Sequence, residues 1–150
     1  MSEKNISFKI YRGIHSIDEI AHLVDFRLSV FTGEQGFPAD KDVDGNDLEA
    51  VHFEMSYNNQ FAGNARYYRK DDYLVISRVA IKKEFRGLGL GKVLVAKVIE
   101  DASQTQYEFA RIRVMDDLIP FYEKFGGKIT GESYFDQGVF FTPMEIPLRG

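Results

Sequence analysis

The stretch 75–99 places an apolar run, a glycine-rich turn and a helical pattern in immediate succession. β-Branched residues over 75–81 predict a strand, and apolar residues at helical spacing over 93–99 predict a helix. The turn between them reads Arg86-Gly87-Leu88-Gly89-Leu90-Gly91-Lys92. Glycine permits positive φ, and the first N–H groups of a helix lack intrahelical partners. Such a turn favours a phosphate or pyrophosphate ligand. The alternative is a helix start that binds nothing.

Two common phosphate-binding motifs do not match this turn. The P-loop consensus requires glycine where Arg86 stands and serine or threonine where Val93 stands. The dinucleotide fingerprint requires a third glycine at the position of Lys92, after an opening βαβ unit that the chain lacks. What remains is the pattern Arg-x-x-Gly-x-Gly over residues 86–91.

Length and composition narrow the class of protein. A chain of 150 residues with 44% hydrophobic residues predicts one globular domain over residues 1–150. A net charge of −4 argues against a nucleic-acid-binding surface, and the absence of cysteine excludes disulfides, thiolate catalysis and cysteine-based metal sites. No signal-peptide segment or membrane-spanning stretch is found, so we expect a cytoplasmic protein that does not contact membranes.

The remaining pattern predicts a sheet with few helices. Ser16 and Glu19 form a capping-box signature for a helix that we expect to end near Gly33 or Gly36. A second helix follows the glycine turn and runs to about Ser103, and a short helix spans 118–125. Strands are expected at 6–11, 50–57, 61–68, 73–81, 109–114, 128–132 and 139–146. This order predicts an α+β fold with a mixed sheet.

An acidic segment, Pro38–Glu49, nearly matches an EF-hand loop. Its aspartates stand at 40, 42, 44 and 47, but Val51 occupies the twelfth position, where calcium requires a bidentate glutamate. A strand pattern also replaces a flanking helix. We therefore expect no metal site, and two interpretations stay open: a solvated acidic loop, or a loop that faces a cationic amine.

Three segments together resemble the GNAT (GCN5-related N-acetyltransferase) superfamily over essentially the whole chain. The first is the Arg-x-x-Gly-x-Gly turn, which resembles the coenzyme A pyrophosphate loop of that family. The second is PFYEKFGGK, in which Tyr122 falls on the general-acid tyrosine. The third resembles small bacterial GNATs of the ElaA and YjcF type. Its matching residues are Arg27, Val30, Phe31, Glu34, Gln35, Asp42, Asp44, Asp47 and His52.

The resemblance implies a central, mostly antiparallel twisted sheet flanked by helices, and direct acetyl transfer from acetyl-CoA to a primary amine of a small molecule or peptide. It places CoA on the backbone of Val79, Ala80 and Ile81 and on Arg86, Gly87, Leu88, Gly89, Leu90, Gly91 and Lys92. Tyr122 would be the acid, or simply a buried aromatic residue. Arg27, Glu34 and His52 would lie near the substrate. Equally, Arg27 would pair with the acidic loop, Glu34 would cap the helix end, and His52 would be structural.

Several positions depart from the family pattern. Met115 stands where a polar amide often contacts pantetheine, Gly127 replaces a phenylalanine, and Phe140-Phe141-Thr142-Pro143-Met144 lacks a histidine before the methionine. Two other functions therefore stay open. One is a GNAT-fold CoA-binding or protein-interaction module with reduced catalysis. The other is an acyl-homoserine-lactone synthase, suggested by Arg27, Phe31, Asp44, Asp47, Arg66 and Arg78. Exposed sheet edges would also permit a homodimer.

Overall fold

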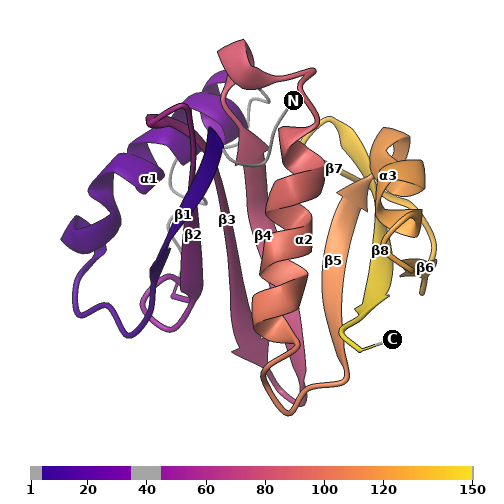
Figure 1. The fold of residues 1–150 in the computed structure, drawn as a ribbon. Helices are drawn as coiled ribbons and strands as arrows, with labels where there is room; N and C mark the ends of the chain where they lie inside the picture. The colour runs from indigo at the N-terminus through magenta and orange to yellow at the C-terminus, as the bar shows by residue number, and fades with distance from the viewer. Residues whose placement is uncertain (1–4, 35–44, 150) are drawn as a thin grey trace.

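One mixed sheet organises the computed structural model, which describes residues 5–34 and 45–149 (Figure 1). The strands are β1 (Ile6–Tyr11), β2 (Val51–Tyr57), β3 (Gln60–Lys70), β4 (Tyr73–Ile81), β5 (Phe109–Met115), β6 (Lys128–Ile129), β7 (Tyr134–Asp136) and β8 (Val139–Pro147). The α-helices are α1 (Ala21–Arg27), α2 (Leu90–Ala102) and α3 (Ile119–Glu123). Shorter helical turns are η2 (Ile17–Ile20), the π-helical η3 (Leu28–Glu34), η5 (Lys83–Phe85) and η6 (Asp116–Leu118).

The strands lie in the order β1-β2-β3-β4-β5-β8-β6, and β7 also pairs with β8. The pair β4–β5 is parallel, and the other described pairs are antiparallel. A parallel pair needs a long crossover, and α2 provides it between β4 and β5. The predicted α+β fold with a mixed, mostly antiparallel sheet is therefore confirmed.

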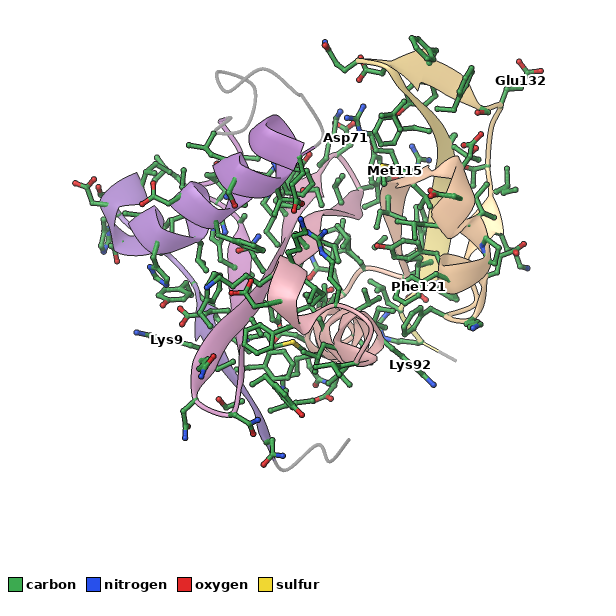
Figure 2. The ribbon with its side chains drawn as sticks, turned by 90° about the horizontal axis from the view of Figure 1, so that it is seen from above. Lys9, Asp71, Lys92, Met115, Phe121 and Glu132 are labelled. Carbon is green, nitrogen blue, oxygen red and sulfur yellow. The ribbon has the colours of Figure 1, made fainter. Side chains whose placement is uncertain are left out.

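Helices cover both faces of the sheet. The apolar side of α2 buries Leu94, Val95 and Val98 in the main core, with Tyr122 of α3 in the same cluster. On the opposite face, Phe26 and Val30 of the α1–η3 segment bury against β4 and β3. Figure 2, seen from above, shows α1 and α2 on opposite sides of the strands. Both helical segments are thus held by burial of an apolar stripe, which is the main source of helix stability in proteins.

Local sequence signals account for most element boundaries. Ser16 and Glu19 form the predicted capping box at the start of η2. Asn58 and Asn59 both have positive φ in the β2–β3 hairpin, as a two-residue turn of the primed type requires. The first strand and the strand 73–81 have the predicted bounds.

The prediction of one strand over 128–132 was wrong. β6 ends at Ile129, and the chain leaves the sheet next to Pro143, against which a Cβ on Gly131 would lie 3.0 Å from Cγ. The separate strand β7 then returns to β8 through a turn in which Gln137 and Gly138 both have positive φ. The residue pattern of the segment does not reveal this break between β6 and β7, because the break arises from contact with the neighbouring strand β8.

Among residues 5–34 and 45–149, no helix is long and apolar enough to cross a membrane. The same residues contain no group of three or more histidine or acidic side chains that could hold a metal ion. The EF-hand-like positions 40, 42 and 44 lie outside the described residues, as does Gln35.

Candidate active site

The sheet is open between β4 and β5 at the end where β4 leads into the glycine turn. These two strands pair only at Leu74–Ala110 and Val75–Arg111, near their beginnings. Beyond this point, Ile76, Ser77, Ala80 and Ile81 of β4 pair with β3, and no described strand pairs with residues 76–81 on the β5 side. Unpaired backbone N–H and C=O groups on an inner strand edge can accept an extended ligand as an added strand.

A β-bulge shapes the end of β4. The register with β3 shifts between Asn64 and Arg66, and Arg78 adopts φ 55° inside the strand. The side-chain amide of Asn64 donates to the carbonyl of Arg78 at 2.9 Å and holds this conformation. Left-handed conformations of non-glycine residues cluster at functional sites. The bulge therefore takes Arg78 and Val79 out of the regular ladder, which resumes with β3 at Ala80 and Ile81.

The glycine turn leaves the first N–H groups of α2 available. Gly87 and Gly89 have φ values of 83° and 79°, which glycine adopts without strain and other residues do not. Gly89 precedes Leu90, the first residue of α2, and no side chain caps the helix there. An uncapped helix of 13 residues that begins at an exposed glycine turn fits a bound diphosphate.

The two basic residues of the turn are differently placed. Lys92 is exposed, and it projects outward from the first turn of α2 (Figure 2). Arg86 folds back toward β4, where its Nε donates to the carbonyl of Ile81 at 2.9 Å. Its Nη2 donates to Oε2 of Glu34, the last residue of η3, at 2.7 Å. The structure thus brings Arg86 and Glu34 together, which their separation of 52 residues in the sequence does not indicate.

The helix α3 meets the start of α2 at Gly91. A Cβ added there would lie 3.8 Å from Cζ of Phe121 and 3.9 Å from Cγ1 of Ile81. Figure 2 shows Phe121 beside α2, which is viewed end-on. Sequence reasoning missed Phe121, although an aromatic residue before the motif tyrosine was a usable signal.

Tyr122 lies in the main core with 5% of its surface exposed. Its ring meets that of Phe121 edge-on at 4.9 Å. Burial raises the pKa of the Tyr122 phenol to about 12. The hydroxyl therefore stays protonated at neutral pH, as a proton donor must.

The end of α3 explains one departure from the family motif. Gly126 has φ 84°, and the N–H groups of Gly126 and Gly127 donate to the carbonyls of Glu123 and Tyr122. A Cβ on Gly127 would lie 2.8 Å from the carbonyl oxygen of Tyr122 and 3.1 Å from Cε of Met144. The backbone path after Tyr122 therefore leaves no room for a side chain at position 127.

A buried ionic cluster lies on the α1 side of the sheet. Asp47, fully buried, accepts hydrogen bonds from Nη1 and Nη2 of Arg27 at 2.9 and 3.0 Å and from Nη1 of Arg66 at 2.8 Å. Nε2 of His52 lies 2.8 Å from the backbone carbonyl of Asp47. Arg27 and His52 have no exposed surface, and Arg27 makes the internal pair that was its structural alternative.

Two pKa shifts follow from this cluster. Burial alone would raise the pKa of Asp47, but hydrogen bonds and charges from Arg27 and Arg66 outweigh it and lower that pKa. Burial lowers the pKa of His52, assisted by the two guanidinium charges and opposed by its contact with Asp47. His52 is thus neutral at pH 7.

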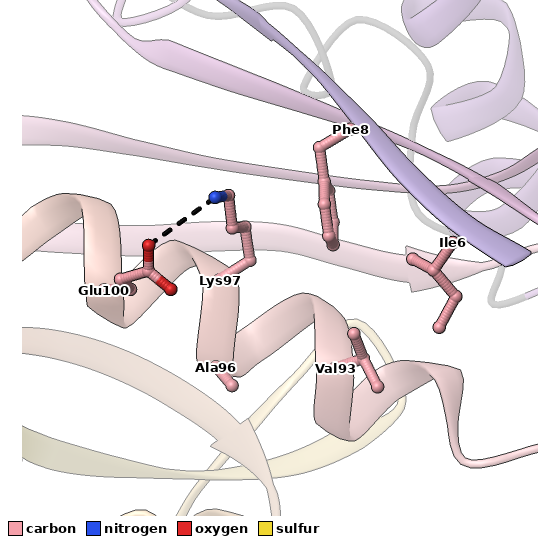
Figure 3. A pocket seen from close by; sticks show the side chains of 6 residues that line it. All are labelled: Ile6, Phe8, Val93, Ala96, Lys97 and Glu100. Carbon is pink, nitrogen blue, oxygen red and sulfur yellow. Dashed lines mark ion pairs between the residues drawn. The ribbon is translucent and has the colours of Figure 1, made fainter. Parts of the chain in front are cut away.

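A shallow hollow of about 250 Å³ lies elsewhere, between β1 and α2. It is lined by Ile6, Phe8, Val93, Ala96, Lys97 and Glu100 (Figure 3). The amine of Lys97 and the carboxylate of Glu100 lie 3.6 Å apart and pair with each other. We assign no ligand to this hollow, because its polar groups already satisfy one another.

A mixed sheet opened beside a bulged strand, with a glycine turn at the start of the crossover helix, agrees with the fold that the predicted resemblance to GNAT proteins implies. The chain belongs to the GNAT acetyltransferase family, because residues 43–148 match the model of the acetyltransferase (GNAT) domain. A member of this class is expected to use acyl-CoA; its substrate does not follow from the family.

Comparisons with individual proteins agree with this assignment. The chain is 26% identical to the uncharacterized N-acetyltransferase YjcF of Bacillus subtilis over 114 residues, which cover 75% of this chain and 81% of that protein. It is 26% identical to the crystal structure of Escherichia coli ElaA, with a TM-score of 0.84 over 94% of this chain and 99% of that one. An acyl-CoA N-acyltransferase from Pseudomonas aeruginosa shares the fold, with a TM-score of 0.85, 22% identity and coverage of 94% and 99%. The predicted resemblance to GNATs of the ElaA and YjcF type is therefore confirmed.

Proposed function

We propose that the protein is an acetyl-CoA-dependent N-acetyltransferase that acts on a primary amine of a small molecule or peptide. The observation that carries this proposal is the opening between β4 and β5, which ends at the uncapped glycine turn of α2. One end can hold a thioester arm as an added strand, and the other can hold a diphosphate.

The backbone of the described site supplies most of the CoA contacts. N–H groups of the turn 87–91, together with the start of α2, would face the diphosphate. Arg86 and Lys92 would add positive charge. The backbone of Val79–Ile81, which follows the bulge at Arg78, would pair with the pantetheine amides and offer one N–H to the thioester carbonyl oxygen.

The transfer forms a bond between the amine nitrogen and the acetyl carbon and breaks the bond between that carbon and sulfur. The amine must first lose a proton, since an unperturbed lysine-like amine has a pKa of about 10.4. The departing thiolate must gain one, since a free thiol has a pKa of about 8.5. Tyr122 is the proton donor that we assign from its place in the family motif. Its phenol is protonated at neutral pH, and the proton that the attacking nitrogen loses as the amide forms would restore it.

On the amine side, we assign a direct contact to Glu34 alone. Its carboxylate is at the surface and adjoins the turn through Arg86. We assign structural roles to Arg27 and His52, because both are fully buried around Asp47. Arg66 is buried as well, so Arg27, Asp47 and Arg66 of the acyl-homoserine-lactone synthase pattern form a buried ionic cluster in this chain.

The test is calorimetric titration of the protein with acetyl-CoA and CoA, compared with an Arg86→Ala, Lys92→Ala variant. Arg69→Ala, Lys70→Ala is the matched control, because it removes the same two charge types at the opposite end of β4. We expect micromolar binding that weakens only in the first variant. A panel of amines in a thiol-release assay then identifies the acceptor class. Binding without thiol release on any amine would favour the CoA-binding module, and no binding at millimolar CoA would refute the proposal.

A further inference from the structure

The ion pair between Arg86 and Glu34 joins the expected cofactor side of the site to the expected amine side. Glu34 ends η3, a π-helical turn that continues α1. Arg86 lies in the glycine turn before α2, with its Nε fixed on the carbonyl of Ile81. The 2.7 Å contact between Nη2 of Arg86 and Oε2 of Glu34 therefore spans the two elements directly.

In this contact the Glu34 carboxylate occupies the Arg86 guanidinium, to which a bound diphosphate would also pair. A bound diphosphate would bring further negative charge to the same turn, and like charges at that distance repel. The pair is weak enough to exchange, because the Arg86 and Glu34 side chains are 43% and 36% exposed. Phosphate oxygens offer Arg86 the stronger, bidentate partner.

We infer that Glu34 masks Arg86 in the free protein and is released when the diphosphate of acyl-CoA binds. This inference rests on the proposed function, because it requires CoA at the glycine turn. The released carboxylate then adjoins the site as an acceptor for a cationic amine. Glu34 is thereby a substrate-contacting residue whose availability depends on the cofactor, and its pairing with Arg86 weakens the affinity of the free protein for CoA.

The chain provides a matched control for the loss of one negative charge near the turn. Glu84 belongs to η5 in the same loop, is 62% exposed and lies 3.8 Å from Lys82. Glu84→Gln removes a charge from the loop without touching Arg86. A general electrostatic effect would appear in both glutamine variants, whereas unmasking of Arg86 would appear mainly in Glu34→Gln.

The experiment is calorimetric titration of CoA into the wild type, Glu34→Gln, Glu84→Gln, Arg86→Ala and the double variant Glu34→Gln, Arg86→Ala, with folding checked by circular dichroism. We expect Glu34→Gln to tighten CoA binding by up to about fivefold, the range of one exposed ion pair. The same substitution should have no effect in the Arg86→Ala background.

Three results would overturn the inference. The first is unchanged or weaker CoA binding in Glu34→Gln while the wild type binds. The second is equal tightening in Glu84→Gln. The third is tightening that persists without Arg86, which would mean plain repulsion. Each of these leaves the proposed function standing, whereas absence of CoA binding in every variant, the wild type included, refutes both.

Discussion

Replacing Asp47 by alanine should destabilise the fold strongly. The carboxylate is fully buried and accepts three hydrogen bonds, two from Arg27 and one from Arg66, at 2.8 to 3.0 Å. The substitution leaves two guanidinium groups in the interior without this partner. Breaking a buried ion pair in this way costs about 3–5 kcal/mol. For a chain of this size, the melting temperature should fall by about 6–20 °C.

The assay is thermal and urea unfolding followed by circular dichroism. Asp72→Ala is the control, because Asp72 is exposed in the β3–β4 turn and should change stability by less than about 0.5 kcal/mol. Asp47→Asn should fall between the wild type and alanine, since the amide keeps an acceptor but loses the charge. A loss below about 1 kcal/mol for Asp47→Ala would refute the argument that this carboxylate neutralises the cluster.

Three further predictions follow from the site and its surroundings. Gly63→Ala should lower the free energy of unfolding by about 1–3 kcal/mol and weaken CoA binding, because the new Cβ would lie 2.9 Å from the carbonyl oxygen of Ala80. Gly45→Ala is the control, because Gly45 has open space around it, and equal losses in both variants would contradict the argument. Tyr122→Phe should lower kcat by about 10²–10⁴-fold with CoA affinity retained, and unchanged turnover would remove Tyr122 as the acid. The free energy of unfolding should fall as the pH drops below the ordinary carboxylate range, because the pKa of Asp47 is lowered in the fold. The stabilisation by ionised Asp47 is complete above the pKa of the unfolded state and is lost as the pH falls through the pKa of the folded state. A flat stability profile from pH 6 to 3 would contradict this.

The glycine turn was predictable because it depends on local backbone chemistry, whereas Tyr122 was singled out by its resemblance to the family motif. Alternating glycines at a helix start have a backbone reason, and the structure places Gly87 and Gly89 at positive φ, as that reason requires. The pairing of Arg27 with the acidic segment was one of two predicted alternatives, and the structure shows Arg27 paired with Asp47 of that segment.

The contacts that the sequence did not reveal are all long-range. Arg86 and Glu34 meet only because the fold brings the end of η3 next to the glycine turn. The opening between β4 and β5 depends on pairing that stops after two residues, which no local pattern encodes. Asn64 was detectable in principle, since a polar residue within a buried strand must find a partner, and its partner is the bulge carbonyl of Arg78.

The missing side chain at position 127 has a consequence for the link from α3 to β6. The backbone carbonyl of Tyr122 occupies the volume that a Cβ at 127 would need, and backbone atoms cannot move aside as a flexible side chain can. Any side chain at position 127 would therefore require the link from α3 to β6 to shift. Position 127 thus cannot change alone in this chain, because a single substitution there would meet the backbone of Tyr122.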